Sequence, residues 1–215
     1  MSTAAGDGAR RILPSGEHAV LVECADADEV LGLHAALTAS RPDGVVDLVP
    51  AARTVLVTVD PARIALETAT SWIAHTEPTP IDAVVSEVVE LPARYDGDDL
   101  TAAATTLGIS VEELVAAHLG ATWRVAFTGF APGFGYLVSD DWPYDVPRLA
   151  SPRTRVPAGA IGLAGAYSGV YPRESPGGWQ LIGTTDAELW NPAADPPARL
   201  VPGATVRFVR QEGES

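Results

Sequence analysis

Arg153 and Arg155 are separated by one residue in the motif SPRTRVP, a spacing that could build an anion site. In an extended segment, residues two apart point to the same face, so the two guanidinium groups would lie side by side. Like charges on one face repel each other unless an anion lies between them, and a carboxylate or phosphate ligand is a natural partner for such a pair. The alternative is that both arginines form ion pairs with acids of the chain such as Asp140, Asp141 or Asp145.

The motif FTGFAPGFGYL at residues 127–137 combines permissive backbone with aromatic side chains. Glycine lets the backbone approach a ligand closely, and loops held on a rigid scaffold are where binding residues gather. We therefore expect this loop to form one wall of a binding site; the alternative is a rigid turn packed on the body of the domain. Its candidate binding residues are Gly129, Phe130, Pro132, Gly133 and Phe134.

A third segment, YPRESPGGWQ at residues 171–180, places a Pro-Gly-Gly turn before a predicted strand. Gln180 could point inward and offer an amide both a donor and an acceptor, and Glu174 is a candidate acid or base. Either residue taken alone is more often structural. Tyr171, Gly178 and Trp179 belong to the same candidate site.

His118 lies with Leu114 and Val115 on the apolar side of a predicted helix. A lone histidine in that position is usually a hydrogen-bonded core residue, and a proton-transfer role is the alternative. The other three histidines are scattered, and Cys24 is the single cysteine. Because no pair has the spacing of metal ligands, we predict no metal site.

The charge composition excludes several classes of function. The net charge is −14, and all 14 basic residues are arginine, so the chain has no lysine. Nucleic-acid binding needs a basic surface to displace counterions, and an anionic membrane surface is disfavoured for the same reason. A Schiff-base enzyme, a Walker-type phosphate loop and a biotin carrier each need a lysine, so this chain carries no biotin. No apolar stretch approaches the length of a membrane span or of a signal peptide, which predicts a cytoplasmic protein.

The first part of the chain, residues 1–91, predicts a two-layer α+β domain. Strands are expected at residues 18–24, 45–49, 54–59 and 83–91, and helices after Asp26 and after Asp60. An aspartate before a helical pattern, and Asp60 followed by Pro61, are typical helix starts. The order β-α-β-β-α-β predicts a ferredoxin-like sandwich with two helices on one face of a four-stranded antiparallel sheet.

The second part, residues 92–215, predicts a β-barrel domain. Helices are expected up to Gly108 and from Ser110, which matches a capping box with Glu113. Short apolar runs then alternate with turn residues, which is typical of a closed or nearly closed barrel. This part holds the candidate site, since 10 of the 14 aromatic residues lie between positions 126 and 190.

The three motifs together resemble one family. TGFAPGFGYL (128–137), PRTRVPAG with its following glycines (152–165) and GVYPRESPGGWQLIG (169–183) are similar to the B subunit of bacterial ATP-dependent 5-oxoprolinase. The same region occurs in the carboxyltransferase part of urea carboxylase, in proteins called allophanate hydrolase subunit 1, and in an inhibitor of a sporulation histidine kinase. The resemblance covers nearly the whole chain. His18 and Gly135 depart from the family pattern, as does the segment from Pro92 to Gly97.

The resemblance implies an α+β protein with a C-terminal cyclophilin-like barrel that acts with two partners, the A and C subunits. ATP, with Mg as a candidate companion ion, would be shared with a partner and would activate the lactam carbonyl of 5-oxoproline, so that water releases glutamate. Arg153 and Arg155 would hold the substrate carboxylate or a phosphate, Gln180 would contact the lactam amide, and His118 would orient or shuttle a proton. The chain would be inactive alone. Two further hypotheses are a component of a biotin-dependent urea or amide carboxyltransferase and a non-catalytic histidine-kinase inhibitor.

Overall fold

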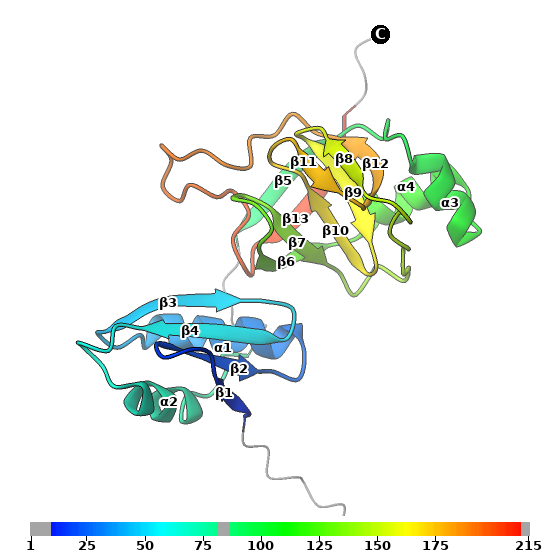
Figure 1. Cartoon of the computed structure of the whole chain (residues 1–215). Coiled ribbons are helices and arrows are strands. Elements are labelled where there is room, and N and C mark those ends of the chain that lie inside the picture. Colours follow the sequence, from blue (N-terminus) through cyan, green and yellow to red (C-terminus); the bar gives the residue numbers. More distant parts are fainter. Residues whose placement is uncertain (1–9, 81–86, 212–215) are drawn as a thin grey trace, which may run out of the picture. The chain divides into compact units, whose positions relative to one another are not determined.

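The computed structural model of the protein describes residues 10–80 and 87–211. The chain divides into two compact units, Met1–Val85 and Ser86–Ser215, each with its own hydrophobic core (Figure 1). The predicted boundary after residue 91 would cut through a strand of the second unit, β5 (Val88–Ala93).

The first unit is a two-layer sandwich of antiparallel strands and two helices. Side chains alternate along the strands, so that Val22 of β2 and Val57 of β4 point into one core. Leu33 of α1 and Ile73 of α2 pack in that same core, and both helices therefore cover the same face of the sheet. The strand order is β1-β2-β4-β3. The elements are β1 (Ile12–Pro14), β2 (Ala19–Glu23), α1 (Ala27–Ala39), β3 (Val45–Pro50), β4 (Thr54–Val59) and α2 (Leu66–Ala74).

The two predicted helix starts have different outcomes. Asp26 caps α1, and its carboxylate accepts a hydrogen bond from the backbone N–H of Glu29 at 2.9 Å, as predicted. The Asp60 carboxylate instead accepts from the backbone N–H of Ala62 at 3.0 Å within a turn. The second helix begins only at Leu66, so the prediction of a helix start at Asp60 is wrong.

The fourth strand of the first unit differs from the predicted one. The predicted strand at 83–91 lies partly outside the described residues, and its described remainder belongs to β5, which pairs with the second unit. In its place, β1 pairs antiparallel with β2 and completes the four-stranded sheet. The predicted α+β class is confirmed, but the β-α-β-β-α-β order is corrected to β-β-α-β-β-α.

The second unit is a β-barrel. Its seven-stranded sheet has the order β12-β9-β10-β7-β6-β13-β5, with β5 and β13 parallel and the other pairs antiparallel. A separate ribbon joins β8 to β11. Its strands are β5, β6 (Trp123–Thr128), β7 (Gly135–Val138), β8 (Arg153–Val156), β9 (Ala160–Ala164), β10 (Tyr167–Val170), β11 (Ser175–Gly177), β12 (Gln180–Thr184) and β13 (Thr205–Arg210).

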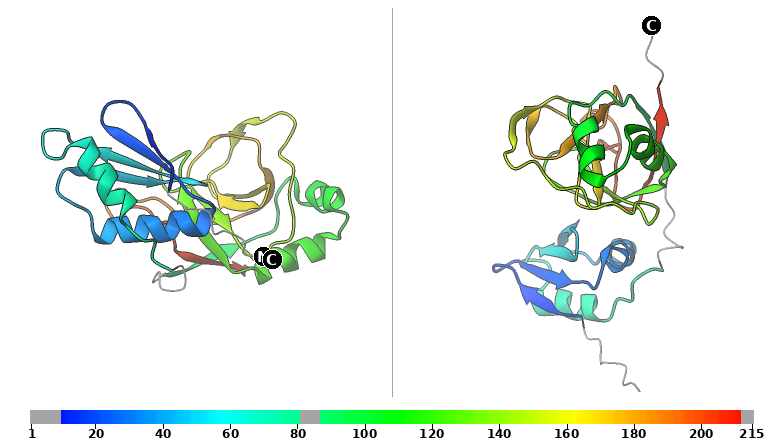
Figure 2. Two further views of the ribbon diagram at one scale, coloured as in Figure 1. Left: turned by 90° about the horizontal axis from the view of Figure 1, so that it is seen from below. Right: turned by 90° about the vertical axis from the view of Figure 1, so that its right-hand side faces the viewer.

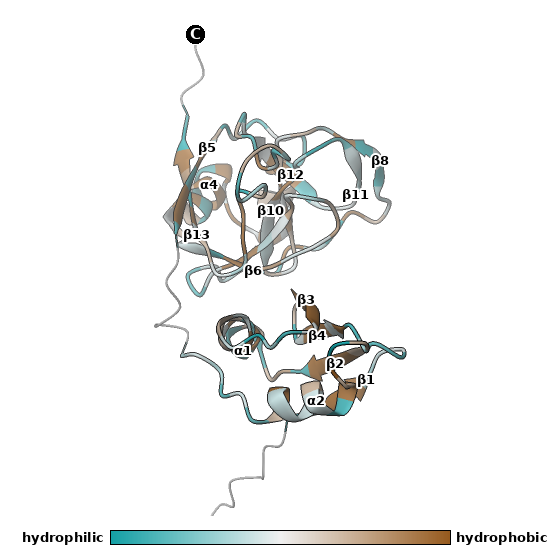
Figure 3. Ribbon diagram, turned by 90° about the vertical axis from the view of Figure 1, so that its left-hand side faces the viewer, coloured by the Kyte–Doolittle hydropathy of each residue, from teal (hydrophilic) through white to brown (hydrophobic). Residues whose placement is uncertain are grey.

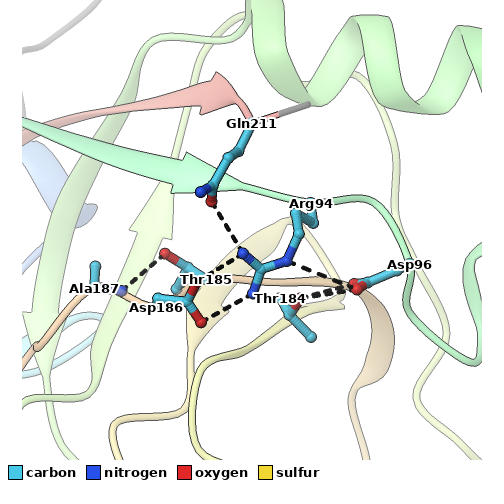
Figure 4. Close-up of polar contacts among 7 residues, drawn as sticks. All are labelled: Arg94, Asp96, Thr184, Thr185, Asp186, Ala187 and Gln211. Carbon is cyan, nitrogen blue, oxygen red and sulfur yellow. Dashed lines mark hydrogen bonds and ion pairs between the residues drawn. The ribbon is translucent and has the colours of Figure 1, made fainter. Parts of the chain in front are cut away.

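The barrel closes where the two outer strands of this sheet meet, just beyond the end of β5. The backbone N–H of Arg94 donates to the Thr184 carbonyl at 2.9 Å, and the N–H of Thr184 donates back at 2.8 Å. The Arg94 guanidinium reinforces this junction through a two-pronged contact with Asp186 at 2.7 and 2.9 Å and a hydrogen bond to Gln211 at 3.1 Å (Figure 4). The Arg94 side chain therefore has a structural role at the junction that closes the barrel.

Two helices, α3 (Leu100–Leu107) and α4 (Val111–Gly120), lie at one side of the barrel (Figure 2). Gly108 ends α3 in the left-handed conformation, and Ser110 and Glu113 form the predicted capping box. No single helix in the described ranges is long and apolar enough to cross a membrane, although the bent pair of α3 and α4 meets the length and composition criteria together. Among the described residues, no three His, Cys, Asp or Glu side chains gather where they could hold a metal ion.

Candidate functional site

A cavity of about 500 Å³ opens in the second unit, between the aromatic loop and the Pro-Gly-Gly turn. Six of its lining side chains are aromatic and one is charged. The lining residues are Phe130, Phe134, Tyr136, Arg148, Pro152, Ala164, Gly165, Tyr167, Tyr171, Pro176, Gly177, Gly178 and Trp179.

The loop at residues 129–134 turns tightly and separates this cavity from a second hollow. The backbone N–H of Phe134 donates to the Ala131 carbonyl at 3.0 Å. Gly133 has φ +84°, and a Cβ there would lie 2.8 Å from Cβ of Trp190, so only glycine fits. Phe134 faces the cavity, Phe130 borders both spaces, and Gly129, Pro132 and Gly133 line a hollow of about 440 Å³ on the other side of the loop.

The aromatic walls of the cavity pack against one another edge to face. The ring of Phe134 lies 5.4 Å from those of both Tyr171 and Trp179, and Tyr136 lies 5.6 Å from Trp179. Such contacts fix the rings in place. Burial raises the pKa values of the Tyr136 and Tyr171 hydroxyls, so both remain protonated hydrogen-bonding groups at neutral pH.

The two glycines of the turn have different neighbours. A Cβ on Gly177 would overlap the Tyr171 hydroxyl and lie 2.9 Å from Cζ of that ring. A Cβ on Gly178 would meet only ordinary contacts, with Nη2 of Arg148 and Cβ of Pro152 both at 3.6 Å. Gly177 is thus required by the packing of Tyr171, while Gly178 leaves room at the edge of the cavity beside Arg148.

The segment that carries Arg148 is held on both sides of that residue, by the Pro-Gly-Gly turn and by the strand β12 that follows it. The Gln180 side-chain Nε2 donates to the Pro147 carbonyl at 3.1 Å. On the other side, the Leu149 backbone N–H donates to the Gly178 carbonyl at 2.9 Å. Gln180 is therefore a positioning residue for the segment that carries Arg148 and is not part of the cavity wall. Its Oε1 is buried with no partner among the described residues.

The arginine pair does not form the anion site that its spacing predicts. Nη2 of Arg153 contacts Oδ1 of Asp99 at 2.7 Å, and the other oxygen of that buried carboxylate accepts from the Leu181 backbone N–H at 2.7 Å. Nε of Arg155 contacts Oε1 of Glu174 at 2.7 Å, and this pair is exposed. Each guanidinium is neutralised by its own carboxylate, and neither arginine lines the cavity. The partners are thus Asp99 and Glu174, and not Asp140, Asp141 or Asp145, which the sequence suggests as ion-pair partners.

Glu174, expected as an acid or base, likewise does not line the cavity. Its segment belongs to the exposed ribbon of β8 and β11, where β8 is strongly hydrophilic (Figure 3). The side chain is occupied by its contact with Arg155.

His118 is a core residue. It is fully buried, its Nδ1 lies 2.8 Å from the Tyr95 hydroxyl and its Nε2 lies 2.9 Å from Oγ of Ser168. Its ring also packs 4.3 Å from that of Phe208 and 5.1 Å from that of Trp123. Burial lowers the pKa of His118 to about 3, so the imidazole is neutral at pH 7. Because it does not line the cavity, the structure gives no support to a proton-transfer role there.

Sequence reasoning finds the apolar walls of the cavity but misses its charge. Phe130, Phe134, Tyr171, Gly178 and Trp179 are all expected and all line the cavity. Tyr136, in the aromatic motif that is expected to form a wall, lines the cavity as well, whereas Tyr167 lies outside the three motifs. Arg148 could not be predicted as a cavity residue, because it belongs to no motif and only the fold brings it close to the Pro-Gly-Gly turn.

A closed β-barrel with an aromatic cavity, in one chain with a two-layer α/β sandwich, defines a two-unit α+β protein. The chain belongs to the family of the carboxyltransferase domain, subdomain C and D, whose model matches residues 10–200.

Two curated relatives have the same name. The chain is 45% identical over 130 residues to the B subunit of 5-oxoprolinase from Escherichia coli O157:H7, covering 59% of this chain and 60% of that protein. It is 43% identical over 126 residues to the B subunit of 5-oxoprolinase from Bacillus subtilis strain 168, covering 57% of this chain and 52% of that protein. The matches thus span little more than half the length of these relatives.

Solved structures extend the likeness over most of the chain. TTHA0988 superposes with a TM-score of 0.79 at 34% identity, covering 92% of this chain and 40% of that longer chain. A conserved uncharacterized protein, PH0987 from Pyrococcus horikoshii, is 33% identical and covers 94% of this chain and 98% of its own, with a TM-score of 0.56. Urea carboxylase of Kluyveromyces lactis has the same fold at 18% identity, with a TM-score of 0.72 over 94% of this chain and 22% of that chain.

Proposed function

We propose that the chain acts as the B subunit of an ATP-dependent 5-oxoprolinase, which hydrolyses 5-oxoproline to glutamate together with the A and C subunits. The observation that carries the proposal is its identity of 45% and 43% to two proteins named as the B subunit of 5-oxoprolinase. The aromatic cavity supports it, because its ring-lined walls suit a small ring such as a five-membered lactam.

The residues around the cavity support a shared active site more than a complete one. A complete amidohydrolase site needs a general base or an activated nucleophile within reach of the substrate. Among the residues that line the cavity, none is a histidine, carboxylate, cysteine, serine or threonine. His118 and Glu174 have other roles in the fold. In this proposal, the groups that activate water come from a partner, and the chain alone is inactive.

The cavity residues do not fit ATP. A triphosphate needs several cationic or N–H donors, because each phosphate group is charged. The cavity offers one guanidinium, and Arg153 and Arg155 are paired with carboxylates of the chain. We therefore assign ATP to a partner and derive no step through it here.

The experiment is reconstitution. The chain is purified alone and together with its A and C partners, and release of glutamate and ADP from 5-oxoproline and ATP is measured. We expect turnover only in the full mixture, dependent on this chain. Turnover by the isolated chain would exclude a shared site, and no turnover by the full mixture would exclude the proposed reaction.

A second candidate is a component of a biotin-dependent carboxyltransferase. The description of the matching family as a carboxyltransferase domain favours it. Because the chain has no lysine, biotin would have to be attached to another protein. Capture of a biotinylated partner on streptavidin, together with this chain, would favour this function over lactam hydrolysis.

A further inference from the structure

Among the described residues that line the cavity, the only charged group is the guanidinium of Arg148. The whole chain has 28 acidic and 14 basic residues, so acids that could pair with an arginine are in excess. Within the described part of the chain, the Arg148 side chain forms no ion pair or hydrogen bond, and its charge acts on the hydroxyls of Tyr136 and Tyr171. The cavity therefore presents a positive charge that no described residue neutralises.

The position of this charge is fixed by the fold. Pro147 accepts a hydrogen bond from the Gln180 side chain of β12 at 3.1 Å, and Leu149 donates one to Gly178 of the turn at 2.9 Å. Gly178 provides no side chain, so Nη2 of Arg148 can come within 3.6 Å of the place where a Cβ would be. Arg148 is itself exposed, so its head group lies at the cavity wall while it remains in contact with solvent.

The rest of the wall favours a small ring that carries one anionic group. Phe134, Tyr171 and Trp179 offer ring surfaces packed edge to face, which suit a flat apolar body. A guanidinium offers two parallel N–H groups that match the two oxygens of a carboxylate. One such fork suffices for a carboxylate but not for a chain of phosphates.

We propose that Arg148 is the specificity-determining residue of this cavity, which binds a small ring bearing a single carboxylate, with the carboxylate on Arg148 and the ring against Phe134, Tyr171 and Trp179. This inference rests on the proposed function, because 5-oxoproline is such a ring. It assigns to Arg148 the anion-binding role that the motif suggests for Arg153 and Arg155.

The test is a calorimetric titration of the full chain with four probes. These are 5-oxoproline, cyclopentanecarboxylate, 2-pyrrolidinone and inorganic phosphate. The first two carry a ring and a carboxylate, the third has the lactam ring without the carboxylate, and the fourth is an anion without a ring. We expect 5-oxoproline and cyclopentanecarboxylate to bind about tenfold or more tightly than 2-pyrrolidinone, as is typical of a hydrogen-bonded charge pair.

The variant Arg148→Gln should bind the three ring compounds with similar affinity, having lost the preference for the carboxylate. Arg207→Gln is the matched control, since Arg207 is an exposed arginine on β13 that does not line the cavity. It removes the same charge and should leave the preference unchanged. Both variants should retain the wild-type thermal unfolding midpoint, because both side chains are exposed.

Three binding results would overturn the proposal. These are an unchanged carboxylate preference in Arg148→Gln, phosphate binding as tightly as 5-oxoproline, or no carboxylate preference in the wild-type chain. The readout is independent of turnover. If the chain shows the Arg148-dependent preference but the mixture with the A and C subunits does not hydrolyse 5-oxoproline, the proposed function fails and the ligand class stands. If hydrolysis occurs and Arg148→Gln leaves its KM unchanged, the assignment of Arg148 fails alone.

Discussion

Arg153 and Asp99 form a largely buried ion pair that joins the ribbon strand β8 to the start of α3, with Nη2 and Oδ1 2.7 Å apart. The same carboxylate accepts from the Leu181 N–H, and the Asp99 backbone N–H donates to the Leu181 carbonyl at 2.9 Å. Asp99 thus holds three segments together, and this explains why its side chain does not cap the helix that it precedes.

We expect Asp99→Asn to destabilise the second unit by about 2 kcal/mol. The new amide has one oxygen and one NH₂ group, so either the Arg153 guanidinium or the Leu181 N–H would face a donor. Removing one partner of a buried pair is costly because the other remains desolvated. The measurement is urea unfolding followed by tryptophan fluorescence, which reports mainly on the second unit because Trp72 is the only tryptophan of the first.

The matched control is Glu174→Gln. It also removes one carboxylate from an arginine, but that pair has side chains 75% and 54% exposed, against 27% and 10% for Arg153 and Asp99. An exposed pair contributes little, so we expect a change within about 0.5 kcal/mol. Equal losses in the two variants would contradict the structural role assigned to Asp99.

These ion pairs also show which features of the structure can be predicted from the sequence and which cannot. The caps at Asp26 and Ser110, the end of α3 at Gly108 and the apolar walls at Phe134 and Trp179 follow from local patterns, and the structure has them. Local spacing puts both arginines on one face, but Asp99 lies 54 positions before Arg153 and no local rule joins them. The parallel pairing of β5 with β13 and the placement of Arg148 are also long-range, and no short motif encodes them.

Adjacent glycines in the turn should differ sharply in their tolerance of alanine. In Gly177→Ala the new methyl group would meet the Tyr171 ring, and overpacking of this kind costs about 1–3 kcal/mol. In Gly178→Ala the methyl group has only ordinary contacts, so the free energy of unfolding should change by less than about 0.5 kcal/mol. Thermal unfolding of the two variants side by side tests this, and a more stable Gly177→Ala than Gly178→Ala would contradict the packing of Tyr171.

The buried His118 should make the protein less stable in mild acid. Its folded-state pKa is lowered to about 3 from 6.5, so between these pH values the unfolded chain binds a proton that the folded chain does not. Stability from this group is therefore complete above pH 6.5 and is lost as the pH falls toward 3. Between pH 7 and pH 5 the loss is about 2 kcal/mol, at 1.36 kcal/mol for each pH unit below 6.5.

The comparison that isolates this effect is His118→Gln, which keeps a neutral polar group but cannot titrate. Urea unfolding at pH 7 and pH 5 should show a smaller acid-induced loss in this variant than in the wild type. His75→Gln, at an exposed position in the first unit, should leave the acid-induced loss unchanged. A wild-type pH dependence retained in His118→Gln would mean that other groups cause it.

Phe130 combines an unfavourable backbone conformation with an exposed ring, which suggests that its side chain serves the cavity more than the fold. Its φ is +66°, a region that bulky residues rarely adopt, and the residue is 55% exposed. Two substitutions separate these features. Phe130→Gly removes the ring and relieves the backbone, whereas Phe130→Ala removes the ring and keeps a Cβ at positive φ.

The stability and the ligand affinity of these two Phe130 variants should therefore respond differently. We expect Phe130→Gly to be more stable than Phe130→Ala by about 1 kcal/mol, because only alanine keeps the strained Cβ. Both should weaken binding of 5-oxoproline to a similar extent, because both remove the same cavity wall. Urea unfolding and calorimetric titration measure the two effects. Equal stability of the pair would show that the loop changes conformation when the ring is lost, and unchanged binding in both would show that Phe130 does not contact the ligand.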